Sequence, residues 1–240
     1  MLFPTRQTSM LVALAISSIL MPAAHAEGLT GQYLATGNVS TIGESLTSMN
    51  NRIGINYAPT SMPGNFDYRF ESYTETSFHG AGDTQVNERK LENQLMYNYP
   101  LNEHVTATVG GLYHTNYTFQ DTYYWAMGGV TLSGDIAPQT SASVTALVEK
   151  RNKGGRAFYD LSGNIEYKFH PLFGMFAAVH VYENLGELDI KPSKKREYEI
   201  GINHYISQRL YAGVSYFHHT QIGDPNDRFA MAKLKFGVNF

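Results

Sequence analysis

Polar and apolar residues alternate along most of this chain with a period of two. In "FYDLSGNIEYKF", which ends at Phe169, apolar residues and glycine occupy every second position from Tyr159 onward, and polar residues fill the positions between them. The same alternation recurs in "KLENQLMYNY" and in "HVTATVGGLYHTNYTF". Successive side chains of a strand point to opposite faces, so the pattern predicts β-strands with one apolar and one polar face.

About twelve such segments follow one another and predict an all-β, antiparallel, up-and-down chain. Tight turns such as "LNEH" and "APQT" alternate with longer polar connections such as "NKGGRA". One segment loses its alternation at Gly128 and Gly129, where we expect a β-bulge. The expected strands are 29–40, 46–58, 65–78, 87–100, 104–119, 122–136, 140–152, 157–170, 172–184, 196–207, 209–220 and 228–240.

The N-terminal segment differs from the rest of the chain. Met1 to Ala26 has a short basic region with Arg6, the apolar run "MLVALAISSIL" and then "AHA" before Glu27. This is the layout of a cleaved secretory signal peptide. We therefore expect residues 1–26 to be removed and residues 27–240 to form one domain.

Composition excludes several classes of protein. The chain has 18 Lys and Arg against 21 Asp and Glu, a net charge of −3, which does not fit a nucleic-acid binder. It has no cysteine, so neither disulfides nor thiolate chemistry is available. The histidines are scattered without ligand spacing, so we expect no metal and no other cofactor.

Aromatic residues predict that these strands form a β-barrel that crosses a membrane. Amphipathic rings concentrate at membrane interfaces, and short turns at one end with longer loops at the other are typical of Gram-negative outer-membrane barrels. The alternative is a secreted soluble barrel with its apolar face inward. The expected belts are Tyr57, Phe66, Tyr97, Tyr99, Tyr167, Phe169 and Phe240 at the turn end, and Tyr73, Tyr117, Phe158, Tyr159, Tyr182, Tyr198 and Tyr216 at the loop end.

Charged residues on the polar faces then line the lumen. Acids and bases are nearly balanced there, and some are expected to pair across strands, for example Glu75 with Lys90. The expected lining acids are Asp67, Glu71, Glu75, Glu92, Glu149, Asp160, Glu166 and Glu199, and the bases are Arg52, Arg69, Lys90, Arg151, Lys168, Lys233 and Lys235.

The last strand, "AKLKFGVNF", resembles the C-terminal strand of outer-membrane β-barrel proteins. In that class, the barrel-assembly machinery reads a final strand that ends in an outward aromatic residue. The resemblance implies that Leu234, Phe236, Val238 and Phe240 face lipid, and that the last three act as the assembly signal.

A narrower resemblance, carried by "LSGNIEYKF" and "LKFGVNF", is to the oligogalacturonate-specific porins, which are small monomeric channels for acidic sugars. The inward bases to which that function would transfer are Arg52, Arg69, Lys168, Lys233 and Lys235. The near balance of acids and bases in the expected lumen differs from the continuous row of bases that a channel for acidic sugars would need. We therefore expect a porin-like, monomeric channel in the cell outer membrane that passes small hydrophilic solutes, including sugars.

Two other functions stay open. One is a non-conducting structural, assembly or export barrel. The other is lipid A acyl hydrolysis, because "FHHTQIGDPND" faintly resembles the His-x-Ser segment of the lipid A deacylases. There, His218 precedes Thr220 instead of serine, and Ala232 stands where the orienting Glu would fall. We therefore do not expect an enzyme.

Two basic clusters flank connections that we place outside the cell. Bases pair well with phosphate, so outer-membrane lipid and lipopolysaccharide are expected partners, although solvated loop charge is the default explanation of such clusters. The clusters are Lys150, Arg151, Lys153 and Arg156, and Lys191, Lys194, Lys195 and Arg196.

The signal peptide makes a direct prediction. The mature protein should begin at Glu27, because the small-x-small sequence "AHA" precedes it. N-terminal sequencing of protein isolated from outer membranes measures this, and a chain that still begins at Met1 would contradict it.

Overall fold

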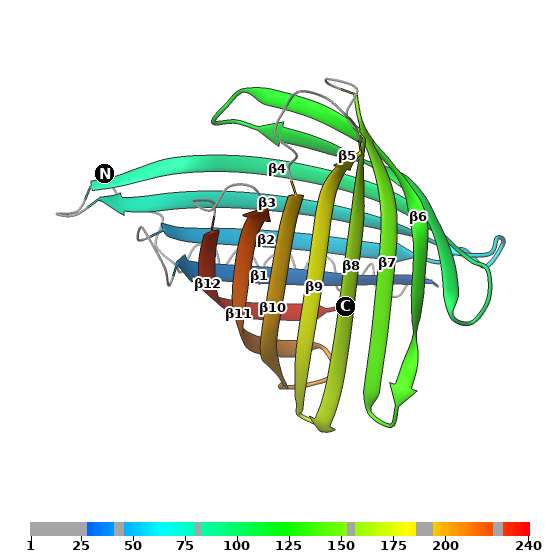
Figure 1. Cartoon of the computed structure of the whole chain (residues 1–240). Coiled ribbons are helices and arrows are strands. Elements are labelled where there is room, and N and C mark those ends of the chain that lie inside the picture. The colour runs from blue at the N-terminus through cyan, green and yellow to red at the C-terminus, as the bar shows by residue number, and fades with distance from the viewer. Residues whose placement is uncertain (1–27, 41–45, 80–82, 153–156, 186–193, 223–227) are drawn as a thin grey trace.

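The computed structural model describes residues 28–40, 46–79, 83–152, 157–185, 194–222 and 228–240. The signal segment Met1–Ala26 lies outside them, so its cleavage stays a prediction. Strands form one closed barrel (Figure 1). They are β1 (Leu29–Ser40), β2 (Leu46–Tyr57), β3 (Asn65–His79), β4 (Asp83–Pro100), β5 (Val105–Asn116), β6 (Asp121–Ala137), β7 (Thr140–Arg151), β8 (Ala157–His170), β9 (Phe173–Leu185), β10 (Lys194–Tyr205), β11 (Leu210–Ile222) and β12 (Arg228–Asn239).

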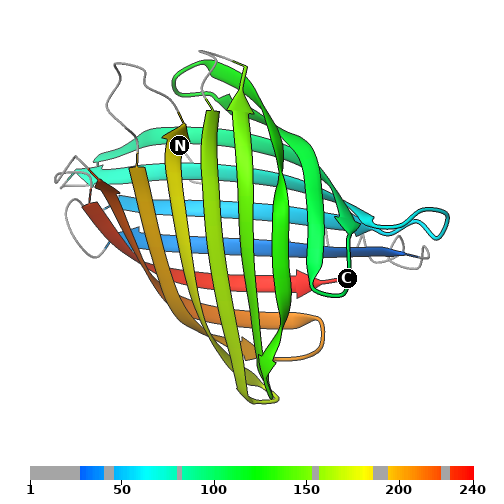
Figure 2. The same ribbon diagram turned by 45° about the vertical axis from the view of Figure 1, so that its right-hand side comes forward.

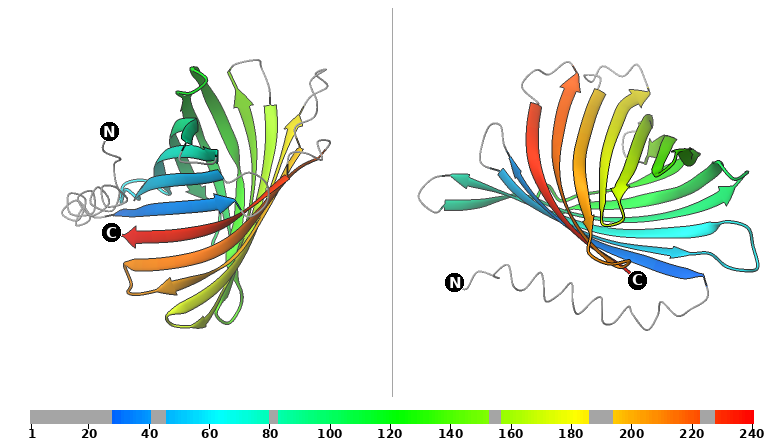
Figure 3. Two further views of the ribbon diagram at one scale, coloured as in Figure 1. Left: turned by 90° about the vertical axis from the view of Figure 1, so that its left-hand side faces the viewer. Right: turned by 90° about the horizontal axis from the view of Figure 1, so that it is seen from below.

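Each strand pairs antiparallel with its neighbours in sequence, and β1 pairs with β12 to close the sheet. Strands on opposite walls cross steeply, as the tilt of barrel strands requires (Figure 2). Figure 3 shows β1 beside β12. The predicted all-β, up-and-down barrel is therefore confirmed. None of the described residues belongs to a helix long and apolar enough to cross a bilayer.

The prediction of a β-bulge at Gly128 and Gly129 is wrong. β6 pairs without a register shift through both glycines, and its irregularity lies between Asp135 and Ala137. A Cβ on Gly129 would lie 1.9 Å from the main-chain oxygen of Ala146. Gly129 is therefore required by the close approach of β7, and the loss of alternation in the sequence reflects that contact.

Apolar side chains lie outside and polar side chains inside, which is the inverse of their distribution in a soluble protein. Leu234 is 66% exposed and Val109 is 59% exposed, whereas His114 and His219 are each 4% exposed. Along each strand the exposed apolar residues alternate with the interior polar ones. An apolar exterior around a polar interior is the arrangement of a membrane barrel. It excludes the soluble alternative, which required the apolar face to point inward.

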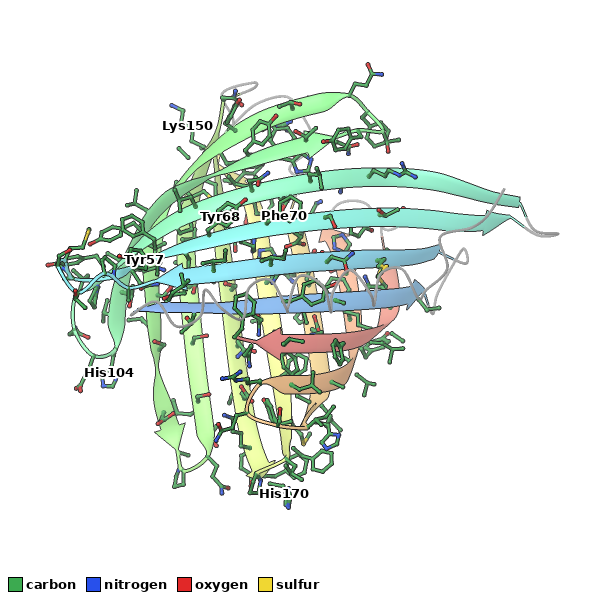
Figure 4. All side chains as sticks on the ribbon, turned by 180° about the vertical axis from the view of Figure 1, so that it is seen from behind. Tyr57, Tyr68, Phe70, His104, Lys150 and His170 are labelled. Atoms are coloured by element: carbon green, nitrogen blue, oxygen red, sulfur yellow. The ribbon has the colours of Figure 1, made fainter. Side chains whose placement is uncertain are left out.

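The turn-end belt lies on the outer face, where the rings of Phe66 and Tyr97 pack 5.0 Å apart. In Figure 4, Tyr57, His104 and His170 lie toward the turn end of the barrel, and Lys150 lies toward the loop end. Polar groups on the outer face find partners of their own. For example, the hydroxyl of Tyr68 donates a 2.8 Å hydrogen bond to Asn93, which removes an unpaired polar group from the apolar surface.

Three members of the expected loop-end belt were assigned to the wrong face. Tyr73, Phe158 and Tyr182 point into the barrel, because each pairs in register with an interior residue: Lys90, Glu149 and Asp160, respectively. We placed these residues at the membrane interface because they lie near strand ends. Their pairing with interior residues of the neighbouring strands shows that they face the interior instead.

Phe240 completes the closure of the barrel. Its main chain exchanges hydrogen bonds of 2.7 and 2.8 Å with that of Gly31. Its ring covers Gly31, where a Cβ would lie 2.1 Å from the nearest ring carbon. The last residue thus fastens β12 to β1 and shields glycine backbone on the outer face.

Replacing Phe240 with Ala should destabilise the closed barrel by about 2 kcal/mol, because it removes the ring that packs over β1. Asn239→Ala should cost about 1 kcal/mol or less, because that side chain receives only a 3.1 Å hydrogen bond from Gln32. Urea unfolding in detergent micelles, followed by the gel shift between unboiled and boiled protein, measures both. Equal losses would contradict a closing role for Phe240.

Candidate functional site

Interior side chains gather into groups that link neighbouring strands. The first group, the Glu71 group, joins β2 and β3. The carboxylate of Glu71 accepts a 2.8 Å hydrogen bond from Arg52 Nε and one of 2.5 Å from Asn50, and it lies 3.8 Å from Arg69 Nε. A single acid therefore contacts two of the predicted lumen bases.

The second group, the Glu199 group, joins β10, β11 and β12. Glu199 accepts hydrogen bonds from Lys233 (2.9 Å), from Ser215 (2.6 Å) and from Lys235. The ammonium of Lys233 lies 3.6 Å from the ring centroid of Phe217, and the ammonium of Lys235 lies over another ring, that of Phe176. Both predicted lumen lysines thus face inward, but neither projects as a free charge.

A third group, the His-Glu-His row, crosses β9, β10 and β11 toward the loop end. The register sets His180 beside Glu197 and Glu197 beside His219. The two oxygens of Glu197 contact the Nδ1 atoms of His180 and His219 at 2.9 and 3.1 Å. Asp160 contacts the other ring nitrogen of His180 at 2.9 Å.

The fourth group, the aromatic group, fills the loop end beside this row. Trp125 packs against Phe158 with ring centroids 5.0 Å apart, and Phe158 stacks on Tyr182 at 4.8 Å. Tyr123 lies next to Trp125 and under the guanidinium of Arg151, 3.5 Å from its ring centroid. These rings narrow the interior at its loop end.

Charged residues border the aromatic group on both sides. Arg151 contacts Asp121 at 3.2 Å. Glu92 contacts His114 at 2.9 Å, and the imidazole of His114 stacks on Tyr123 at 4.3 Å. An acid on β4 is therefore connected through rings to a base on β7.

The other predicted lining residues lie near strand ends. Asp67 accepts hydrogen bonds from Asn56 and Asn98 at the turn end. Glu166 accepts one from Tyr205, whose ring lies 5.6 Å from the ammonium of Lys168. Near the loop end, Glu75 accepts a 2.6 Å hydrogen bond from Tyr73, and the register sets Tyr73, not Glu75, beside Lys90.

Glu149 stands apart from the paired acids. Its side chain is 7% exposed, and within the described residues no base lies within ion-pair distance of it. It is separated by one position on β7 from Arg151, which is engaged by Asp121.

Sequence reasoning missed Glu197, His180, His219, Asp121 and the inward aromatic rings. Glu197 shares its strand face with Glu199, two positions away, so its facing was available from the pattern. The two histidines carried no such signal, because only the register between strands sets them beside Glu197.

Acid–base catalysis finds little support in these groups. Both ring nitrogens of His180 contact carboxylates, so neither is available to accept a proton from a hydroxyl. Among the described residues, no set of His, Asp and Glu has the arrangement of a metal site. The chemistry that the groups provide is recognition by hydrogen bonds and charge.

The two residues that would carry deacylase chemistry lie on the outer face. His218 and Thr220 both point outward from β11, and the hydroxyl of Thr220 lies 3.5 Å from the main-chain oxygen of Arg196. In the part of the chain that the structure describes, no carboxylate contacts His218. Among the described residues of this segment, a nucleophile, a base and an orienting acid are not assembled.

Parts of the two basic clusters can be placed. Lys150 and Arg196 are exposed on the outer face near the loop end, whereas Arg151 points inward to Asp121. The predicted contacts of Lys153, Arg156 and Lys191 with phosphate lie outside the described residues.

Solved structures share this fold. The NanC porin matches with a TM-score of 0.57 at 12% identity, over 87% of this chain and 98% of that one. An outer-membrane channel from Pseudomonas putida F1 matches with a TM-score of 0.60 at 10% identity, over 88% and 94%. The KdgM porin matches with a TM-score of 0.50 at 12% identity, over 87% and 98%.

No protein-family model matches the chain, and no curated protein matches its sequence. The structural similarities show that the chain has the fold of outer-membrane β-barrel proteins, among them the KdgM porin, which was also solved in complex with disordered oligogalacturonate. Identities of this size show the fold alone.

The His-Glu-His row and Glu149 make opposite predictions for stability. Glu197→Leu should destabilise the barrel by about 3 kcal/mol, because it leaves two interior histidines without their carboxylate. Glu149→Gln should change stability by less than about 1 kcal/mol or increase it, because it removes a buried acid that no described base neutralises. Urea unfolding in micelles measures both variants, and equal destabilisation would contradict these pairings.

Proposed function

We propose that this protein is a passive channel of the outer membrane for small hydrophilic solutes. The observation that carries the proposal is a closed barrel with polar groups throughout its interior and large apolar side chains on its exterior. An interior dedicated to structure alone can be filled with apolar side chains, whereas a path for hydrated solutes needs polar walls. The channel-forming proteins that share the fold support this reading.

The number of strands allows such a path but does not guarantee it. Barrels of eight strands are filled by side chains, and barrels of sixteen enclose a wide channel. The aromatic group narrows the loop end, where Phe158 and His114 are buried. This narrowing favours one rival, a non-conducting structural or export-associated barrel, which a conductance measurement separates from a channel.

Ion pairing inside the barrel bears on selectivity. Glu71 and Asp121 hold Arg52 and Arg151, and Glu199 holds both interior lysines of β12. A lumen in which the bases are held by acids differs from a continuous basic track. We therefore expect a small preference between anions and cations, in contrast to a channel dedicated to acidic sugars.

The environment follows from the outer face. We propose that lipid contacts the apolar band, that the exposed Lys150 and Arg196 bind the phosphates of lipopolysaccharide, and that the assembly machinery reads Phe236, Val238 and Phe240. Because β1 and β12 pair with each other, one chain closes the barrel without a partner. Closure therefore needs no second chain, and we propose a monomer.

Planar-bilayer recording of the folded protein tests the proposal. A channel should give discrete conductance steps in potassium chloride, with a reversal potential close to zero in a salt gradient. Steps absent from every sample that shows the gel shift of a folded barrel would overturn the proposal and favour the structural barrel.

The Glu199 group makes a sharper prediction. Glu199→Gln removes one negative charge and releases two lysines, so the reversal potential should shift toward anion preference. Lys233→Met together with Lys235→Met should shift it toward cation preference, because Glu199 is left unpaired. Charges inside a narrow lumen are screened less than exposed ones. Lys150→Met on the outer face is the matched control and should leave selectivity unchanged. Equal shifts in the control would refute the interior placement.

A further inference from the structure

A hollow of about 210 Å³ opens in the interior wall about midway along β7 to β11. The hollow forms because small side chains occupy two adjacent rows of residues that pair across β7, β8 and β9. Ser143 on β7 pairs with Asn164 on β8, which pairs with Ala178 on β9, and Ser162 on β8 pairs with His180 on β9. Small residues therefore form the floor, and larger ones on the next strands form one side.

The polar side chains of the floor are unengaged. Within the described residues, no hydrogen bond or ion pair involves the side chains of Ser143, Ser162 or Asn164. By contrast, the neighbouring Ser215 and Thr145 each have a side-chain partner. Two hydroxyls and one amide thus present donors and acceptors to whatever occupies the hollow.

The side wall combines an aromatic ring with acids. His180, Glu197, Glu199 and Phe217 line it. A concave site with an apolar wall and a few convergent polar groups is the usual form of a small-molecule site. The volume of the hollow is large enough for one ring of the size of a monosaccharide.

Charge decides which ring fits. Both nitrogens of His180 contact carboxylates, and Lys233 and Lys235 are bound to Glu199. The oxygens of Glu197 and Glu199 already contact His180, His219 and the two lysines, so no unpaired base among the described lining residues is left for an acidic guest. A carboxylate that loses its water without gaining a free base is destabilised, so the site disfavours anions.

The geometry points to a binding subsite for one neutral, hydroxyl-rich ring, such as a neutral sugar, with acidic sugars disfavoured. The site rests on the proposed function, since solutes reach the hollow only through the barrel. Ser143, Ser162 and Asn164 bind the hydroxyl groups, Phe217 covers apolar carbons of the ring, and a carboxylate is disfavoured because Glu197 and Glu199 already engage the nearby bases. The specificity that it gives is the reverse of that for acidic sugars.

Galactose and galacturonate are the matched probes, because they differ at one carbon, where galacturonate carries a carboxylate and galactose a hydroxymethyl group. Equilibrium dialysis of each radiolabelled sugar against the folded full-length protein in detergent measures binding, and bilayer recording of the same sample measures conductance. We expect galactose to bind at least about tenfold more tightly than galacturonate, the discrimination that one rejected group commonly gives.

Variants test whether the hollow is the site. Ser162→Val and Asn164→Leu should each weaken galactose binding several-fold, whereas Ser141→Val, on the same interior face of β7 but outside the hollow, should not. Glu199→Gln should narrow the difference between the two sugars. The gel shift confirms that each variant is folded, and interior substitutions of this size leave the lipid-facing surface intact.

The outcomes separate the subsite from the channel. Conductance without galactose binding, equal binding of both sugars, or binding that ignores Ser162 and Asn164 overturns the subsite and leaves the proposed channel standing. Galactose binding that depends on these residues, in a protein that never conducts, supports the subsite and overturns the channel.

Discussion

The hydrogen bonds that join β1 to β12 are the constraint on which the rest of the structure depends. In hydrocarbon no water is available to satisfy a free strand edge, so a sheet that crosses a membrane must close on itself. Phe240 and Gly31 make the closing contact near the turn end, with main-chain bonds in both directions and a ring over the glycine. Once the sheet is closed, every strand has one face toward lipid and one toward a shared interior, and the period of two follows along the whole chain.

Closure also determines how the interior is organised. Strand neighbours bring together residues that are far apart in sequence, and the resulting rows run around the barrel: Ser162, His180, Glu197 and His219 form one of them. Aromatic side chains cover glycines of the next strand, as Phe176 covers Gly201 and Tyr211 covers Gly237. These pairs keep large side chains close to the wall. The interior can therefore hold many ion pairs and still leave hollows at small residues.

The pairing of interior charges links structure to function. A buried charge without a partner is costly, so acids and bases in a narrow barrel gather into groups such as those around Glu71 and Glu199. The same pairing leaves few free charges to attract an ion of either sign. What remains for recognition are neutral polar groups that no interior partner engages, and one group of them lies where Ser143, Ser162 and Asn164 meet.

The sequence by itself determined the strands, the short turns and the facing of Lys233, Lys235 and Glu199, because a period of two is written in neighbouring residues. It also led to the barrel class through the apolar faces and the final strand. Only the tertiary structure decided that Tyr73, Phe158 and Tyr182 point inward, that Gly129 meets β7 without a bulge, and that His180 and His219 share Glu197. The reason is that register, which aligns residues of different strands, is set by hydrogen bonds between segments and leaves no periodic trace within any one of them.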